Sequence, residues 1–159
     1  MNKLIKIEDT NKLDPKIKKE HKSIVLVGGC FDLLHYGHIS FLKKAKSYGN
    51  FLIIALESDE SVRRMKGKNR PIHTQKQRKI MLESLIFVNK VITLPPMLSD
   101  EQYYELVRKI KPNIIAATEG DPILDKKRLQ AKEVNAQIII IAKVHSPSSS
   151  QLAKLLDFD

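Results

Sequence analysis

The sequence predicts an α/β fold in which a doubly wound sheet of five parallel strands carries helices on both faces. Short apolar segments alternate about five times with segments whose apolar residues recur at helical spacing. The apolar segments are continuous rather than alternately polar, as expected for parallel strands that are buried on both faces. A length of 159 residues and a hydrophobic content of 42% suit one domain of this kind.

Each expected strand is a short apolar run, and two of the runs end at clear turn signals. Ile24 to Val27 stops at Gly28-Gly29, and Val91 to Leu94 stops at Pro95-Pro96. The expected strands cover residues 24–27, 51–56, 91–94, 113–117 and 136–142. Such a Rossmann-like sheet binds ligands at the carboxyl ends of its strands, near the point where the strand order switches. The loop from Gly28 to Gly37 and the segment from Glu57 to Asp59 are expected there.

Apolar periodicity and capping signals indicate the helices. Apolar residues recur every third position between Gly37 and Tyr48, and Gly49 is expected to cap that helix. Thr74-x-x-Gln77 and Ser99-x-x-Gln102 are capping boxes, which mark helix starts. The expected helices cover residues 37–48, 74–87, 99–111, 126–134 and 148–156.

Composition limits the partners that the chain is expected to have. Residues 1–22 are polar and highly charged, so we expect an arm outside a domain that covers residues 23–159. The net charge is +10, but the basic residues are dispersed and the few aromatics do not interleave with them. We therefore expect no nucleic-acid partner. The sequence has no apolar run long enough to span a membrane and a single cysteine, Cys30, so we expect a cytoplasmic protein with no membrane partner.

The segment His35-Tyr36-Gly37-His38 follows the first strand and opens the first helix. Two imidazoles three residues apart lie on one helix face, beside free backbone N–H groups and the positive end of the helix dipole. Gly37 has no Cβ, so a phosphate can approach closely. Nucleotidyl transfer needs positioning and positive charge rather than a protein nucleophile, and this segment supplies both.

Other interpretations of these residues exist. A His-x-x-His pair can be half of a zinc site, but no second pair of ligands lies at suitable spacing, so we expect no metal ligands. Histidines on a helix are also often only surface residues. Ser148 to Ser150 follow Pro147 at the start of the last helix. Their hydroxyls could bind a second anion or simply cap the helix.

The pattern Gly29-Cys30-Phe31-Asp32-x-x-His35-x-Gly37-His38 resembles the signature of the cytidylyltransferase-like nucleotidyltransferases. This family includes glycerol-3-phosphate cytidylyltransferases and the heptose-1-phosphate adenylyltransferases of lipopolysaccharide core biosynthesis. The heptose enzymes are the most similar, because they share a pattern like the one from Ser58 to Ile72 and an arginine at Arg78.

The resemblance implies a set of roles for individual residues. His35, His38 and Lys66 would be catalytic, and Asp32 and Arg78 would bind substrate. The nucleotide would be bound by Gly29, Cys30, Phe31, Gly37, Gly120, Asp121, Ser148, Ser149 and Ser150. The family also implies a nucleoside triphosphate with Mg²⁺, a small phosphorylated acceptor, release of pyrophosphate and a possible homodimer.

The chain departs from the family pattern at Ile86, Asn89, Thr118-Glu119 and Lys143. These changes weaken a cytidine-specific interpretation, so ATP is the expected nucleotide and a sugar 1-phosphate a possible acceptor. One alternative is a CTP-dependent enzyme that acts on an alcohol phosphate such as glycerol-3-phosphate. Another is a nucleotide-binding module without turnover.

Overall fold

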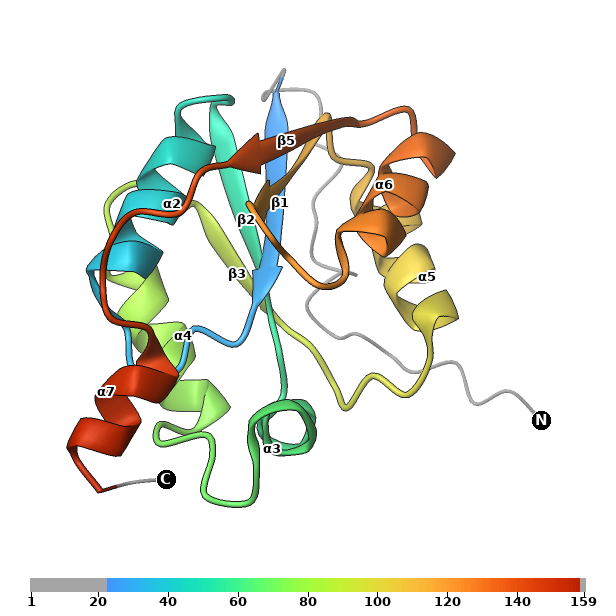
Figure 1. The fold of residues 1–159 in the computed structure, drawn as a ribbon. Helices are drawn as coiled ribbons and strands as arrows, with labels where there is room; N and C mark the ends of the chain where they lie inside the picture. The colour runs from blue at the N-terminus through green and yellow to red at the C-terminus, as the bar shows by residue number, and fades with distance from the viewer. Residues whose placement is uncertain (1–22, 158–159) are drawn as a thin grey trace.

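Five parallel strands form the central sheet of the computed structural model, which describes residues 23–157 (Figure 1). The order across the sheet is β3-β2-β1-β4-β5, and every neighbouring pair is parallel. The predicted fold class is therefore confirmed. The charged arm expected over residues 1–22 lies outside the described residues. The strands are β1 (Ile24–Gly29), β2 (Phe51–Leu56), β3 (Lys90–Thr93), β4 (Ile114–Thr118) and β5 (Gln137–Ile141).

Helices pack on both faces of the sheet. Figure 1 shows α2 and α4 on one side and α5 and α6 on the other. Within the described part of the chain the helices are α2 (Tyr36–Lys46), α3 (Asp59–Lys66), α4 (Gln75–Glu83), α5 (Asp100–Ile110), α6 (Leu124–Glu133) and α7 (Ser149–Leu155).

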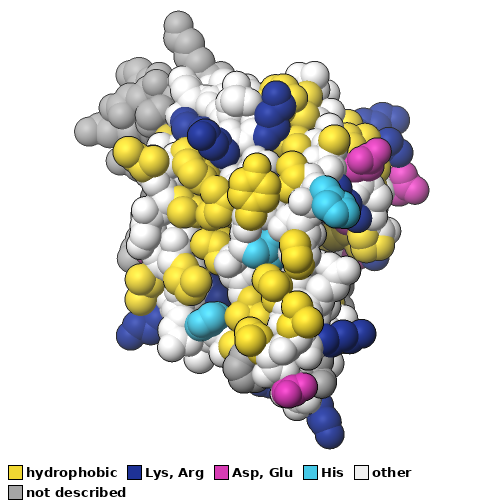
Figure 2. Space-filling model, turned by 60° about the vertical axis from the view of Figure 1, so that its left-hand side comes forward, with side chains coloured by type: hydrophobic (Ala, Val, Ile, Leu, Met, Phe, Trp, Pro, Cys, Tyr) yellow, Lys and Arg dark blue, Asp and Glu magenta, His cyan; other side chains and the backbone are white. Residues whose placement is uncertain are grey.

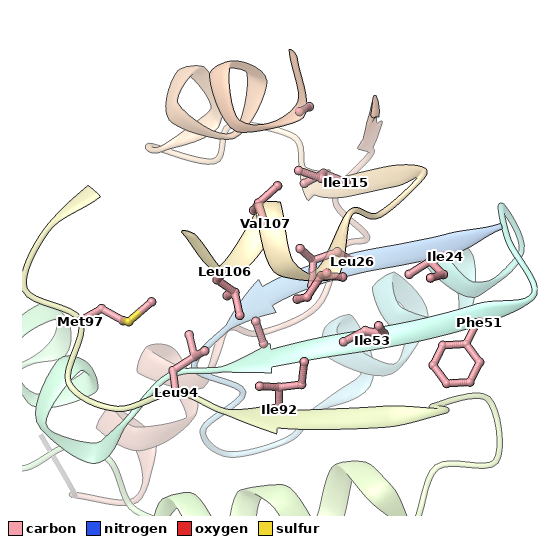
Figure 3. Packing of buried hydrophobic residues seen from close by; sticks show 13 residues of the cluster. Ile24, Leu26, Phe51, Ile53, Ile92, Leu94, Met97, Leu106, Val107 and Ile115 are labelled. Atoms are coloured by element: carbon pink, nitrogen blue, oxygen red, sulfur yellow. The ribbon is translucent and has the colours of Figure 1, made fainter. Parts of the chain in front are cut away.

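Two apolar clusters hold the three layers together. Leu42 of α2 and Leu82 of α4 pack in one cluster with alternate residues of β1 and β2. Leu106 of α5 packs in the second cluster, together with Leu26 of β1 and Ile53 of β2 (Figure 3). These two strand residues alternate along the chain with those of the first cluster. Because each central strand contributes to both clusters, all six residues of β2 are buried. This double burial explains why the strands appear in the sequence as continuous apolar runs.

Two expected helix ends are wrong. The first helix ends at the cap residue Ser47, not at Gly49. A side chain at Gly49 would place Cβ 2.6 Å from the Ser23 carbonyl oxygen, so close packing explains this glycine. Helix α4 ends at Glu83 rather than near residue 87. The residues after it continue the apolar pattern because Leu85, Phe87 and Val88 pack against the core from a turn.

Helix α3 was missed by the sequence analysis. Ser58 caps it by accepting a hydrogen bond from the Ser61 backbone N–H at 3.1 Å. Its buried residues are Ser61 and Val62, and most of the others are charged. A helix with one buried apolar side chain shows no apolar periodicity, which is why the pattern did not predict it.

The strand order places a switch point between β1 and β4. From β1 the chain builds outward through β2 and β3, then crosses back to add β4 and β5 on the other side. Loops that follow β1 and β4 therefore diverge and leave a crevice at the carboxyl ends of the strands. No helix within residues 23–157 has the length and apolar character needed to cross a bilayer.

Candidate active site

A cavity of about 370 Å³ lies where the chain leaves the carboxyl ends of β1, β4 and β5. Most of the predicted site residues line it, but Asp32, Arg78, Gly120, Ser149 and Ser150 do not. Its walls come from the loop after β1 (Gly28, Gly29, Cys30, Phe31), the start of α2 (His35, Gly37, His38, Phe41), the end of α3 (Lys66), the segment from β4 into α6 (Thr118, Asp121, Lys127) and the segment from β5 to α7 (Ala142, Lys143, Val144, Ser146, Ser148).

The two histidines of the motif stack on each other in this cavity. Their ring centroids are 3.9 Å apart, and the Phe31 ring meets His38 edge-on at 5.3 Å. His35 is the N-cap of α2, and its Nδ1 accepts a hydrogen bond from the Gly37 backbone N–H at 3.0 Å. A neutral His35 ring that accepts at Nδ1 must carry its proton on Nε2. The motif thus fixes one imidazole as a donor at its far nitrogen.

Gly37 is required for this arrangement. A side chain there would place Cβ 2.9 Å from His35 Cε1 and 3.1 Å from its Nδ1. The expectation that Gly37 leaves room for a phosphate stays a prediction. The immediate reason for glycine is that the His35 ring folds back over this position to cap the helix.

Burial and neighbouring positive charge keep both imidazoles neutral. Burial lowers the pKa of His38 to about 3, and the proximity of His35 and Lys66 acts in the same direction. The pKa of His35 is also lowered, first by burial and then by Lys66. Neutral imidazoles donate hydrogen bonds without an initial positive charge, so near neutral pH the pair acts as a set of N–H donors.

Lys66 joins the histidines from a distant part of the sequence. It is the last residue of α3 and lines the cavity. Its Nζ donates to Ser149 Oγ at 3.1 Å. The three predicted catalytic residues are therefore brought to one cavity. The three predicted phosphate-binding serines differ, because Ser148 lines the cavity, Ser149 is buried and Ser150 is exposed.

The charge of the cavity walls suits an anion. Lys66, Lys127 and Lys143 line it, and Asp121 is the acidic residue among its lining side chains. Lys127 Nζ lies 2.6 Å from Asp121 Oδ2, so that carboxylate is already paired. The sequence analysis nominated Asp121 but missed Lys127, whose place in the cavity depends on how α6 packs. Gly120 precedes Asp121 with a φ of 71°, a left-handed conformation that favours glycine.

Figure 2 views the side of the molecule that carries α2 and α7. Histidine side chains lie there among hydrophobic ones, with lysine and arginine side chains around them. Acidic side chains are sparse on this face. Apolar and basic side chains thus predominate on this face.

The sequence matches the family described as cytidylyltransferase-like over residues 26–152, a range that includes every residue of the cavity wall. The chain belongs to the cytidylyltransferase-like nucleotidyltransferases. This family assignment confirms the resemblance drawn from the motif between Gly29 and His38.

Two curated relatives share the name bifunctional protein HldE. The protein from Aliarcobacter butzleri is 42% identical over 147 residues, which cover 92% of this chain and 29% of that protein. The one from Wolinella succinogenes is 33% identical over 152 residues, or 96% of this chain and 31% of that protein. This nucleotidyltransferase therefore spans about a third of the length of these relatives.

Solved structures show the same fold. A lipopolysaccharide core biosynthesis protein from Thermoplasma volcanium has a TM-score of 0.60 and 26% identity, covering 77% of this chain and 96% of that one. A pantoate-beta-alanine ligase from Francisella tularensis has a TM-score of 0.64 and 19% identity, covering 89% of this chain and 66% of that one. At this lower identity the likeness concerns the fold alone.

The structure changes the interpretation of Asp32 in this nucleotidyltransferase. Its carboxylate has no exposed surface and accepts hydrogen bonds from Arg70 Nε at 2.8 Å and from the backbone N–H groups of Ile72 and His73. Burial opposes ionisation, but the hydrogen bonds from Ile72, His73 and Arg70 outweigh it and lower the pKa of this carboxyl. Asp32 anchors the loop before α4 to the motif, so we replace the expected substrate contact by a positioning role.

Arg78 is buried in the same way. Its guanidinium donates to the carbonyl oxygens of Cys30 at 2.6 Å and Glu57 at 2.9 Å, and to Asp59 Oδ1 at 2.7 Å. These contacts tie the ends of β1 and β2 together below the cavity. Arg78 is 1% exposed, so its expected contact with substrate is replaced by this structural one. A single arginine on α4 thereby sets the spacing of two strand-end loops.

Glu57 and Tyr103 form a polar pair that the sequence analysis did not identify. Tyr103 donates its hydroxyl to Glu57 Oε1 at 2.9 Å, and the second oxygen of Glu57 is buried. Burial raises the pKa of the Glu57 carboxyl, against the hydrogen bond from Tyr103. An acidic residue directly after a fully buried strand was the signal available in the sequence. Its partner comes from α5, which only the fold could supply.

Proposed function

We propose that this nucleotidyltransferase transfers AMP from ATP to a small phosphorylated acceptor such as a sugar 1-phosphate and releases pyrophosphate. The observation that carries the proposal is the stacked pair of His35 and His38, which shares one cavity wall with Lys66 at the switch point of the sheet. Imidazole N–H groups and an ammonium in one cavity suit a triphosphate.

The proposed chemistry needs no nucleophile from the protein. An oxygen of the acceptor phosphate forms a bond to the α-phosphorus of ATP. The bond from that phosphorus to the bridging oxygen breaks, and its electron pair leaves with pyrophosphate. The protein contributes positioning and stabilisation of negative charge, which are the largest effects in reactions of this type.

Each catalytic group has a distinct task in this proposal. His35 carries its proton on Nε2, so the ring can donate to a phosphate oxygen while its other nitrogen holds the helix cap. His38 is half-buried next to it and kept neutral. Lys66 supplies the positive charge that the neutral imidazoles lack. The set therefore combines directional donors with one cation.

Mg²⁺ belongs to the proposal as a partner of the triphosphate. Residues 23–157 contain no group of three or more His, Cys, Asp or Glu side chains that could hold a metal ion. The carboxylate in the cavity wall, Asp121, is paired with Lys127. Magnesium is commonly bound through substrate phosphates and water, so these residues fit an ion that arrives on the nucleotide. When bound, it would neutralise phosphate charge.

The choice of ATP and a sugar phosphate rests on relatives and on sequence departures. The relatives named HldE are 33% and 42% identical, and one similar structure is described as a lipopolysaccharide core biosynthesis protein. The heptose-1-phosphate adenylyltransferases, which the sequence resembles most, belong to that biosynthesis. Lys143 and Thr118 line the cavity at positions where this chain departs from the cytidylyltransferases or the heptose enzymes.

A pyrophosphate-release assay tests the proposal. The protein is supplied with ATP or CTP and with sugar 1-phosphates, glycerol-3-phosphate or FMN. We expect release with ATP and a sugar 1-phosphate. Turnover with CTP and glycerol-3-phosphate would instead establish the cytidylyltransferase alternative. Tight nucleotide binding without release for any acceptor would establish a non-catalytic module.

Variants locate the activity in the cavity. We expect His38→Ala to lose turnover by at least about a hundredfold, as for removal of a transition-state donor. His145→Ala is the matched control, because His145 is exposed and is not among the cavity-lining residues. Equal activity of the His38 variant and the wild type would contradict the assignment.

A further inference from the structure

The buried hydroxyl of Ser149 touches the ammonium of Lys66. The two residues are 83 positions apart in the sequence, and Nζ lies 3.1 Å from Oγ. Ser149 is 4% exposed although it sits between the exposed residues Ser148 and Ser150. Burial of this one serine means that its hydroxyl points into the protein, toward α3, and away from solvent.

Lys66 needs a partner of this kind. It is the last residue of α3, and Gly67 follows with a φ of 107° and with no atom within 4 Å of the place that a Cβ would take. A lysine side chain carries about 2 kcal/mol of rotamer entropy, so a contact is needed to hold its ammonium in one place. Within the described residues, no carboxylate forms an ion pair with Lys66. The hydrogen bond to Ser149 is therefore the contact that limits where the ammonium can go.

The same contact joins the two sides of the cavity. Lys66 comes from α3, after β2, and Ser149 comes from α7, after β5. Strands β2 and β5 lie on opposite sides of β1 in the sheet. A hydrogen bond between their following helices therefore spans the crevice at the switch point.

The neighbouring serines have other tasks. Ser148 lines the cavity, and its hydroxyl caps α7 by accepting from the Gln151 backbone N–H at 3.2 Å. Ser150 is exposed. The three hydroxyls in a row, which look equivalent in the sequence, thus face the cavity, the interior and solvent.

We infer that Ser149 is a positioning residue, which holds the Lys66 ammonium at the phosphate site instead of binding the nucleotide itself. An ammonium has three N–H donors. One donates to Ser149, so two remain for phosphate oxygens. The inference rests on the proposed function, because it assigns Ser149 to that reaction through Lys66.

A double-mutant cycle with Ser149→Ala and Lys66→Met tests this inference. We expect Ser149→Ala alone to lower kcat/KM for ATP by about tenfold or more, the value of a hydrogen bond to a charged group. In the Lys66→Met background the same change should have an effect of less than about twofold, because the group that it positions is gone. Ser149→Thr, which keeps a hydroxyl, should retain more activity than Ser149→Ala.

Two further measurements separate positioning from damage to the fold. Thermal unfolding of each variant reports whether a loss of kcat/KM accompanies a loss of stability. Lys154→Ala is the control for a substitution at an exposed position of α7. Dissociation constants for ATP, measured in the same cycle, test the coupling without turnover. Independent, multiplicative effects of the two substitutions would overturn the inference.

The outcomes also distinguish this inference from the proposed function. If wild-type protein neither binds nor turns over ATP or CTP, the proposed function fails and the inference fails with it. If wild-type protein turns over but Ser149→Ala loses the same factor with and without Lys66, only the role of Ser149 is wrong. If coupling appears in ATP binding without any turnover, Ser149 positions Lys66 in a binding module.

Discussion

Replacement of Asp32 by asparagine separates a positioning role from a substrate contact. Asp32 is fully buried, and its carboxylate accepts hydrogen bonds from Arg70, Ile72 and His73. An asparagine has the same shape but no charge, and its amide nitrogen would face these donors. Neutralising one partner of a buried ion pair costs about 3–5 kcal/mol, because the other charge loses its compensation. We expect the free energy of unfolding of Asp32→Asn to fall by that amount.

Urea unfolding at neutral pH measures the effect, with kinetics on the same samples. The control is Asp100→Asn, which removes a charge from the exposed ion pair between Asp100 and Lys126. An exposed pair contributes about 0–1 kcal/mol, so that variant should stay close to the wild type. Unchanged stability of Asp32→Asn, together with a raised KM for the acceptor, would refute the positioning role and restore the substrate contact.

The pH dependence of this difference follows from the lowered pKa of Asp32. A lowered carboxyl pKa contributes stability above its unfolded value, and this stability is lost as the pH falls through the folded value. The difference in unfolding free energy between the wild type and Asp32→Asn should therefore be largest near neutral pH. It should narrow only in acid, below the ordinary range of an aspartate.

Three further predictions concern the cavity and the layer below it. Burial holds the pKa of His38 at about 3 against an ordinary value of 6.5, so wild-type stability should fall as the pH drops between these values. In His38→Gln the free energy of unfolding should depend less on pH over this range. Urea unfolding that gives the same pH dependence for both proteins would contradict the prediction. The raised pKa of Glu57 means that its contribution to stability is lost as the pH rises above its ordinary value of 4.5. Glu57→Gln, which can still accept a hydrogen bond from Tyr103, should therefore gain stability relative to the wild type as the pH rises above 4.5, and a difference in unfolding free energy that shrinks over this rise would argue against this. Gly37→Ala should displace the His35 ring and weaken ATP binding by about tenfold in calorimetry, as for loss of one charge-assisted hydrogen bond; wild-type affinity would show that the cap is dispensable.

The sequence by itself determined the sheet and the motif. The runs at 51–56 and 24–27 became buried strands, because parallel strands covered on both faces must be apolar throughout. The capping box at Thr74 opens α4, with Gln77 accepting from the Thr74 backbone N–H as expected. His35 and His38 meet because three residues along a helix start are neighbours in space. These are local relations, and local patterns encode them.

Only the tertiary structure decided the contacts between distant segments. The hydrogen bond from Lys66 to Ser149 and the ion pair between Asp32 and Arg70 join residues that no periodicity connects. Lys66 was nominated by family resemblance, since a lysine at the end of a charged helix has no distinguishing pattern. Asp32 looked like a substrate ligand because its place in the motif is visible in the sequence, whereas its burial is not. Burial depends on which elements pack over a residue, and that is a property of the whole fold.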